Sequence, residues 1–246
     1  MEYKVNINGI DVEAEYKDEN IRDIFIPLLK KLSEIQKKKN GRVIAFLAAP
    51  PGAGKSTLAS FLQYLSVQNN IAEKLQVIGM DGFHRRHEFL KTHSMIRDGK
   101  EIRMVDVKGA PETFDIDMLT ERLKEISSGE LCGWPVYDRL LHDAVDNAII
   151  VDSDMIILEG NYLLLTGPGW NELSEMADYT VFVRADEDLL RERLVSRRIE
   201  SGHGEADSVK FVEFSDMYNV KKILDDSKKA DLMLELGSDG SYSVLK

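Results

Sequence analysis

The chain has 246 residues, of which 43% are apolar, and its formal net charge is −11. This size suits one α/β domain with a full core and a small appended element. The acidic balance argues against a dedicated nucleic-acid-binding protein, which would normally carry a basic face. The single cysteine, Cys132, excludes an intramolecular disulfide, and no apolar run approaches the roughly 20 residues of a membrane span. Because the first residues also lack the apolar segment of a signal peptide, we expect a cytoplasmic protein with no membrane partner.

A hairpin and a helix are predicted at the start of the chain. Residues 3–16 alternate between apolar and polar side chains around Asn8-Gly9, and Asn-Gly between two such runs is a strong hairpin signal. Apolar residues then recur with helical spacing over 21–35, with Asn20 as the expected N-cap and Asn40-Gly41 as the expected stop. Both elements precede the main motifs of the chain, so we expect them to form an accessory element.

The most specific motif follows the apolar run 43–47. Residues 48–57 read Ala-Ala-Pro-Pro-Gly-Ala-Gly-Lys-Ser-Thr, and a buried strand that breaks into such a glycine-rich turn is the signature of a phosphate-binding P-loop. Glycines allow backbone N–H groups to turn around a phosphate, and the following helix presents its N-terminal N–H groups to the same anion. Lys55 would reach the β- and γ-phosphates and Ser56 would bind Mg²⁺, although Ala49 replaces the first glycine of the usual pattern. The predicted nucleotide-binding residues are Pro51, Gly52, Ala53, Gly54, Lys55, Ser56 and Thr57.

The rest of the chain alternates between strands and helices. Strands are predicted at 75–80, 148–151, 155–158, 179–184 and 230–236, with a terminal hairpin at 237–245. Helices are predicted at about 58–65, 115–127 and 187–200, and residues 84–108 are predicted as loop with a short helix. Strands separated by helices imply a mostly parallel sheet with helices on both faces. We therefore predict a three-layer α/β/α fold with a five-stranded sheet over residues 42–246, and the accessory element at 1–41.

Two predicted strands end in a carboxylate. Asp81 follows the second strand and Glu159 follows the strand at 155–158, and ligands of open α/β sheets bind outside the carboxyl ends of the strands. An acidic residue after an apolar run is typical of a carboxylate that contacts Mg²⁺ directly or through water, and both residues could fill that role. One would then hold the metal, and the other would accept a proton from an attacking hydroxyl.

Five blocks of sequence stand in order along the chain, at 49–57, 80–84, 108–115, 135–139 and 159–164. Together they resemble the phosphoribulokinase/uridine kinase/pantothenate kinase group, and look most like the branch often labelled fructose transport system kinase or nucleoside/nucleotide kinase-like. The resemblance implies a P-loop NTPase fold and a kinase that uses ATP and Mg²⁺ to phosphorylate a hydroxyl of a sugar, nucleoside or related metabolite. It also implies that Asp81 is the catalytic base, with a turn-forming or metal-bound aspartate as the alternative, and that Ser56 and Glu159 organise Mg²⁺.

The same resemblance implies an acceptor site for a small molecule. Its expected residues are Asp81, Phe83, His84, Lys108, Tyr137, Arg139 and Asn161. Lys108 could contact an anionic acceptor, and a place for Phe83 in the core is at least an equal alternative. Tyr137 and Arg139 resemble the segment that lines the acceptor site in uridine and phosphoribulo kinases, and the alternative for them is a surface strand edge with a local ion pair.

The helix predicted at 187–200 is rich in arginine. In the kinases that the chain resembles, such a helix forms a lid whose arginines neutralise the transferring phosphoryl group, a task suited to guanidinium. Arg193 and Arg197 are four residues apart and share one face, so we expect them to contact phosphate. Arg191 and Arg198 are expected to be solvated or paired with nearby acids, and an ion-paired surface helix is the alternative for Arg193 and Arg197. The expected catalytic residues are Lys55, Asp81, Arg193 and Arg197.

The leading hypothesis is therefore phosphoryl transfer from ATP to a small hydroxyl-bearing acceptor, with no nucleic-acid partner. The alternative is a regulatory P-loop ATPase that binds partners and has no small acceptor. The blocks around Asp81 and Tyr137 favour the kinase, because a pure switch needs neither. The accessory element could serve as a homodimer surface in either case.

Overall fold

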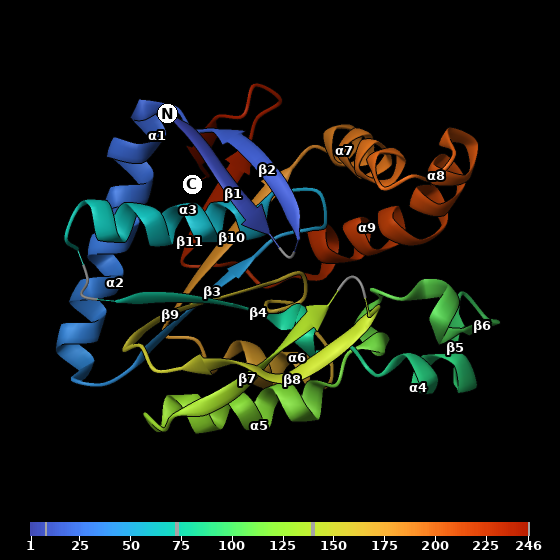
Figure 1. The fold of residues 1–246 in the computed structure, drawn as a ribbon, viewed down its shortest axis with the longest axis horizontal. Coiled ribbons are helices and arrows are strands. Elements are labelled where there is room, and N and C mark those ends of the chain that lie inside the picture. Colours follow the sequence, from blue (N-terminus) through green and yellow to red (C-terminus); the bar gives the residue numbers. More distant parts are fainter. Residues whose placement is uncertain (8, 72–73, 139–140, 246) are drawn as a thin grey trace.

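The computed structural model describes residues 1–7, 9–71, 74–138 and 141–245, and its centre is a six-stranded sheet (Figure 1). The strands, in their order across the sheet, are β12 (Tyr242–Val244), β11 (Leu232–Leu236), β10 (Tyr179–Ala185), β3 (Val43–Ala48), β9 (Met155–Gly160) and β4 (Leu75–Gly79). The first of these runs antiparallel to its neighbour, and the other five are parallel to one another. The prediction of a mostly parallel sheet is confirmed, with one strand more than five because the end of the terminal hairpin joins the edge of the sheet.

Helices cover both faces of this sheet. Alternate residues of β3 point into two separate cores, because Ala45 and Leu47 pack on one face while Ile44 and Phe46 pack on the other. The first face is covered by α2 (Ile26–Lys39), α3 (Lys55–Gln68) and α7 (Glu187–Glu200), and the second by α5 (Ile116–Ser127) and α6 (Trp170–Ser174). Burial on both faces explains why β3 is a continuous apolar run, and the three-layer prediction is confirmed.

The N-terminal hairpin packs against α3. Its strands, β1 (Glu2–Ile7) and β2 (Ile10–Glu15), pair antiparallel as predicted. The Tyr16 ring, directly after β2, stacks on Phe61 of α3 with 3.9 Å between ring centroids, and Tyr3 Oη lies 2.8 Å from Ser60 Oγ. The hairpin therefore shares a core with the main sheet, and Figure 1 shows it lying across α3.

Asn20 is not the N-cap that the sequence predicts. It belongs to α1 (Asp18–Asn20), and the chain continues through a π-helical turn (Ile21–Phe25) into α2. The Asn20 amide instead donates to the backbone O of Tyr242 at 2.6 Å and accepts from its backbone N–H at 2.9 Å. Because Asn20 is buried, its amide must be hydrogen-bonded, and β12 supplies both partners.

The segment predicted as loop with a short helix holds more structure than expected. It contains α4 (His87–Thr92) and an antiparallel hairpin of β5 (Ser94–Arg97) and β6 (Lys100–Arg103). The turn between the two strands uses positive φ at Asp98 and Gly99. These strands have four residues each and are mostly polar, so they carry too little alternation to be recognised from the sequence.

The strand predicted at 148–151 is the end of a longer strand that lies outside the main sheet. It belongs to β8 (Asp143–Val151), which pairs with β7 (Cys132–Asp138) in a two-stranded sheet. Proline and glycine in β7 hide its strand character. After α7, the chain forms α8 (Glu205–Phe211), a second π-helical turn (Val212–Asp216) and α9 (Met217–Asp226). Among the described helices, none combines the length and the apolar character needed to cross a membrane.

Candidate active site

The P-loop connects the end of β3 to the start of α3, as the motif predicts. Gly52 and Gly54 have φ of +86° and +78°, conformations that residues with a side chain rarely adopt. A Cβ on Gly52 would also lie 3.2 Å from the backbone O of Leu190 and from Leu194 Cγ. The loop is therefore pressed against α7, and both glycines are needed for its shape.

Ser56 and Glu159 meet at the ends of neighbouring strands. Ser56 Oγ donates a hydrogen bond of 2.9 Å to Glu159 Oε1, and Lys55 Nζ lies 4.0 Å from Glu159 Oε2. The Glu159 side chain is 12% exposed. Burial raises the pKa of this carboxyl, the charge of Asp81 adds to the rise, and Lys55 and the Ser56 hydroxyl oppose it. A hydroxyl and a carboxylate beside a phosphate-binding loop are oxygen donors of the kind that Mg²⁺ prefers, so the residues present fit that ion.

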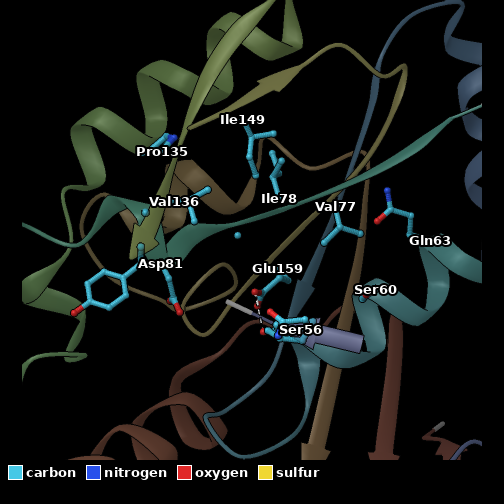
Figure 2. A pocket seen from close by; sticks show the side chains of 15 residues that line it. Ser56, Ser60, Gln63, Val77, Ile78, Asp81, Pro135, Val136, Ile149 and Glu159 are labelled. Carbon is cyan, nitrogen blue, oxygen red and sulfur yellow. Dashed lines mark hydrogen bonds between the residues drawn. The ribbon is translucent and has the colours of Figure 1, made fainter. Parts of the chain in front are cut away.

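Asp81 lies on a 3-10 turn (Met80–Phe83) that follows β4. The turn is pressed against β7, because a Cβ on Gly82 would lie 2.1 Å from the backbone O of Pro135. Asp81, Ser56 and Glu159 line a single cavity of about 220 Å³, which Tyr137 also lines (Figure 2). Residues from four separate blocks of the sequence thus share one space next to the P-loop.

Two further expected acceptor residues, Lys108 and His84, contact Tyr137 from behind the cavity wall and do not themselves line the cavity. Lys108 Nζ donates to Tyr137 Oη at 2.9 Å and to the backbone O of His142 at 2.9 Å. His84 Nδ1 donates to the backbone O of Asp81 at 2.8 Å, and its ring lies 5.3 Å from the Tyr137 ring. Burial lowers the pKa of His84, an effect that the Asp81 charge opposes, so the imidazole is held toward its neutral form.

The structure does not place the remaining three expected acceptor residues in the cavity. Phe83 is 1% exposed and packs edge-on against Trp134 with 4.8 Å between ring centroids, so it belongs to the core, as the alternative had it. Asn161 does not line the cavity, and its Oδ1 is buried without a hydrogen-bond partner among the described residues. Arg139 lies outside the described residues.

The arginine-rich helix α7 begins at the N-cap Asp186, whose side chain accepts from the backbone N–H groups of Asp188 and Leu189. Arg193 Nη1 donates to the backbone O of Gly52 at 3.4 Å, so this arginine reaches the P-loop. Arg191 forms ion pairs with Asp188 and with Glu213, so it is paired with nearby acids, as expected.

The next turn of α7 faces the C-terminal helices. Burial raises the pKa of Asp216, and the charges of Arg197 and Arg198 oppose that rise. The Arg198 guanidinium lies over the Phe211 ring, 3.8 Å from its centroid. Arg193 and Arg197 therefore lie in different surroundings, although they share a helix face.

Two further groups of residues at the site were not among the expected site residues. Tyr162 is fully buried and donates to the backbone O of Gly109 at 2.5 Å, while Trp134 Nε1 donates to the backbone O of Gly79 at 2.8 Å. The first bond ties the segment after β9 to the loop at Gly109, and the second ties β7 to the end of β4. Asn6 and Ile7 of the N-terminal hairpin line the same cavity as Asp81, although nothing in their own segment indicates chemistry.

The strand, P-loop and helix, with a carboxylate at each of two further strand ends, define a P-loop kinase fold. A family model described as Phosphoribulokinase / Uridine kinase family matches residues 43–241, and the chain belongs to this family. The match leaves out the hairpin, α1 and α2.

Known proteins resemble the chain over most of its length. It is 38% identical over 243 residues to the uncharacterized protein YggC of Escherichia coli (strain K12), with 98% of both chains covered. It is 30% identical over 205 residues to a candidate uridine kinase of Schizosaccharomyces pombe, which covers 80% of this chain and 85% of that protein. A solved structure from Silicibacter sp. TM1040, described as a candidate fructose transport system kinase, has a TM-score of 0.72 and 29% identity, with 83% of this chain and 98% of that chain covered.

Proposed function

We propose that this protein is a Mg²⁺-dependent kinase that transfers the γ-phosphoryl group of ATP to a hydroxyl of a sugar, a nucleoside or a related polar metabolite. The observation that carries the proposal is the single cavity that joins Ser56 of the P-loop helix to Asp81 and Glu159. A hydroxyl in that cavity would lie between a candidate base and the phosphate-binding loop, the arrangement that phosphoryl transfer needs. We also propose a cytoplasmic location, because the buried thiol of Cys132 is free and suits a reducing compartment.

The P-loop would hold the donor. Its backbone N–H groups and the Lys55 ammonium would offset negative charge on the phosphate oxygens as the transition state forms. Ser56 and Glu159 would hold Mg²⁺, which when bound neutralises charge on the phosphates. Arg193 already reaches the P-loop backbone from α7 and would add positive charge beside the phosphates.

Asp81 would act as the general base. The acceptor hydroxyl gives its proton to the Asp81 carboxylate while its oxygen bonds to the γ-phosphorus of ATP. The bond from that phosphorus to the bridging oxygen breaks, and ADP leaves with the electron pair. The contact between Gly82 and β7 fixes the turn that carries Asp81, so the base is held before the acceptor arrives.

The acceptor end of the cavity suits a polar molecule. Tyr137 offers a hydroxyl there, and Lys108 donates to that hydroxyl. A wall of this kind matches an acceptor with several hydroxyls, and the charge of Lys108 favours one that also carries an anionic group. The names of the relatives, a candidate uridine kinase and a candidate fructose transport system kinase, agree with a nucleoside or a sugar.

The proposal is tested by incubating the protein with Mg-ATP and a panel of nucleosides, sugars, sugar phosphates and pantothenate while ADP is measured. We expect one class of acceptor to raise ADP release at least about 10-fold over the rate without acceptor. The Asp81→Asn variant should lose that acceptor-dependent part by at least about 100-fold, because the base is removed while its size is kept.

The outcome that supports a regulatory ATPase is different. Such a protein would release ADP at a rate that no acceptor changes and that Asp81→Asn leaves intact. Lys55→Ala should abolish nucleotide turnover in either case, and it therefore serves as the control for the P-loop itself.

A further inference from the structure

A second cavity, of about 360 Å³, opens on the P-loop away from the residues that carry Asp81 and Glu159. It is lined by Gly54 and Thr57 at the start of α3, by Arg193 of α7, and by residues from the end of β11 to Tyr242. Its remaining wall is the N-terminal hairpin, which contributes the five consecutive residues Val12, Glu13, Ala14, Glu15 and Tyr16. The hairpin lies outside the part of the chain that the family model matches.

The position of this cavity suits the ribose and base of a bound nucleotide. A nucleoside triphosphate with its γ-phosphate toward Asp81 must direct its ribose and base away from the acceptor cavity. The second cavity starts at Gly54 and Thr57. The ribose and base of a nucleotide bound to the P-loop would therefore extend into it. Arg193, which donates to the backbone O of Gly52, lies at the junction between the P-loop and this space.

Strand β2 presents an unpaired backbone edge to the cavity. Met1 and Tyr16 exchange two backbone hydrogen bonds, of 2.9 and 2.7 Å, so they form a hydrogen-bonded pair. Hydrogen-bonded and non-hydrogen-bonded pairs alternate along an antiparallel ladder. In the register of this hairpin, Lys4 and Glu13 are therefore a pair whose backbone groups point away from the partner strand. The hairpin is a two-stranded sheet, and no described strand pairs with the outer edge of β2.

That edge borders the cavity on the side of α7, although Glu13 and Glu15 are themselves exposed. The cavity is lined by residues of β2 and by none of the described residues of β1, and Figure 1 shows β2 as the strand of the hairpin nearer α7. At Glu13 and Glu15 the outer edge offers backbone N–H and C=O groups in alternation. A purine base carries a ring nitrogen acceptor, and in adenine an amino donor beside it, which pair with such an edge. The apolar side chains of Val12 and Ala14 line the same space, and a guanidinium such as that of Arg193 stacks on aromatic rings.

We propose that the outer edge of β2, at Glu13 and Glu15, binds the base of the nucleoside triphosphate, so the N-terminal hairpin is part of the nucleotide site. This inference rests on the proposed use of ATP. The hairpin is fixed for that role, because Lys17 forms an ion pair with Asp239 of the opposite wall and Tyr16 stacks on Phe61. A base would therefore meet a wall that is already ordered, which lowers the cost of binding.

Proline at position 13 tests the edge directly. Glu13→Pro removes one outward N–H and leaves the hydrogen bonds to β1 intact, because that N–H does not point at β1. Lys4→Pro is the matched control: it makes the same change on the outer edge of β1, and it breaks the same ion pair between Lys4 and Glu13. We expect Glu13→Pro to weaken ATP binding at least about 10-fold and Lys4→Pro to leave it within about 2-fold. Inorganic tripolyphosphate, which has no base, should bind both variants like the unchanged protein.

Three results would overturn the inference. An unchanged affinity for ATP in Glu13→Pro would show that the outer edge of β2 does not bind the base. An equal loss of ATP affinity in Glu13→Pro and Lys4→Pro would show that the hairpin has only a structural role. A loss of tripolyphosphate affinity in Glu13→Pro would show damage to the P-loop rather than loss of base contacts. Circular dichroism and thermal unfolding of both variants identify a variant that has failed to fold.

Photolabelling of the unchanged protein gives a second test that needs no substitution. An azido-ATP carrying its reactive group on the purine should label the peptide that contains residues 10–16. Labelling confined to other peptides would contradict the inference. Both tests measure binding without an acceptor, so a protein that passes them but phosphorylates nothing would remove the proposed kinase activity and leave the base site standing.

Discussion

Ser56 Oγ donates a hydrogen bond of 2.9 Å to Glu159 Oε1, which joins the first turn of the P-loop helix to the end of a strand 103 residues later. The pairing of β3 with β9 brings these two residues together, because Leu47 and Glu159 are partners in the parallel register. Serine and glutamate are each common on protein surfaces, so neither residue alone indicates a site. Together, beside Lys55 and within the cavity that holds Asp81, they form a pair of oxygen donors where a metal–phosphate complex would lie.

The pH dependence of stability tests the state of Glu159. Burial raises the pKa of this carboxyl above its ordinary value of 4.5, so the folded protein binds its proton more tightly than the unfolded chain does. The free energy of unfolding should therefore fall as the pH rises from about 4.5 through the folded-state pKa. In Glu159→Gln, urea unfolding at a series of pH values should show a shallower fall over that range. Equal slopes in the two proteins would contradict the raised pKa.

The same carboxyl links Mg²⁺ to pH. Mg²⁺ needs the ionised carboxylate, so the affinity for Mg²⁺ in the presence of ATP should increase as the pH rises through the folded-state pKa of Glu159. Calorimetric titration at several pH values measures this change. Glu159→Gln should lower the affinity and remove the dependence, and an unaltered pH profile in that variant would exclude Glu159 as the ligand.

Gly82→Ala should destabilise the protein by about 1–3 kcal/mol, because its Cβ would lie 2.1 Å from the backbone O of Pro135 and neither backbone can yield easily. The matched control is Gly41→Ala, where the added Cβ would meet only an ordinary contact at 3.9 Å and stability should change by less than about 0.5 kcal/mol. Thermal unfolding of the two variants checks the difference. Similar melting temperatures would show that the turn carrying Asp81 is not fixed by β7.

Arg193 and Arg191 offer a matched comparison on one helix. Arg193 reaches the P-loop backbone, whereas Arg191 is held by the exposed acids Asp188 and Glu213. Arg193→Ala should lower kcat/KM for ATP at least about 10-fold, and Arg191→Ala should change it less than about 2-fold. Steady-state kinetics with the acceptor found in the panel measures both. Equal losses of kcat/KM in the two variants would contradict a specific role for Arg193 at the phosphates.

Lys108 provides a test of the acceptor end. Removing its charge with Lys108→Met should raise the KM of an anionic acceptor about 10-fold, because Lys108 donates to the Tyr137 hydroxyl at the cavity wall. The KM for ATP should not change. Lys91→Met, which removes an exposed lysine of α4, is the control and should alter neither constant. An unchanged acceptor KM in Lys108→Met would separate Lys108 from the acceptor.

Local patterns predicted the elements whose signal lies within a few neighbouring residues. The P-loop and the N-terminal hairpin both depend on such short-range geometry. The central strands β3 and β9 were also predictable, because burial on both faces makes each of them a largely continuous apolar run.

Features decided by distant contacts were not predictable. Asn20 is of a residue type that often caps helices, but its side-chain amide is hydrogen-bonded to the backbone of Tyr242 near the other end of the chain. Phe83 stands beside Asp81 in sequence, yet the turn directs it into the core against Trp134. The need for glycine at position 82 arises only when β7 is folded against it, so a single sequence gives no sign of it.

The N-terminal hairpin shows the same limit most clearly. Its alternating pattern predicts a pair of strands and says nothing about what they face. Only the fold brings Asn6 to the cavity of Asp81 and Glu13 to the cavity beside Gly54. An element that seemed accessory in the sequence thus borders both candidate binding sites.

The most direct measurement of the central claim is the mass of the acceptor after incubation with Mg-ATP, for the unchanged protein and for Asp81→Asn. We expect an acceptor that gains one phosphoryl group for each ADP formed, and a loss of this product by at least about 100-fold in Asp81→Asn. ADP formed without any phosphorylated acceptor, at the same rate in both proteins, would contradict this claim.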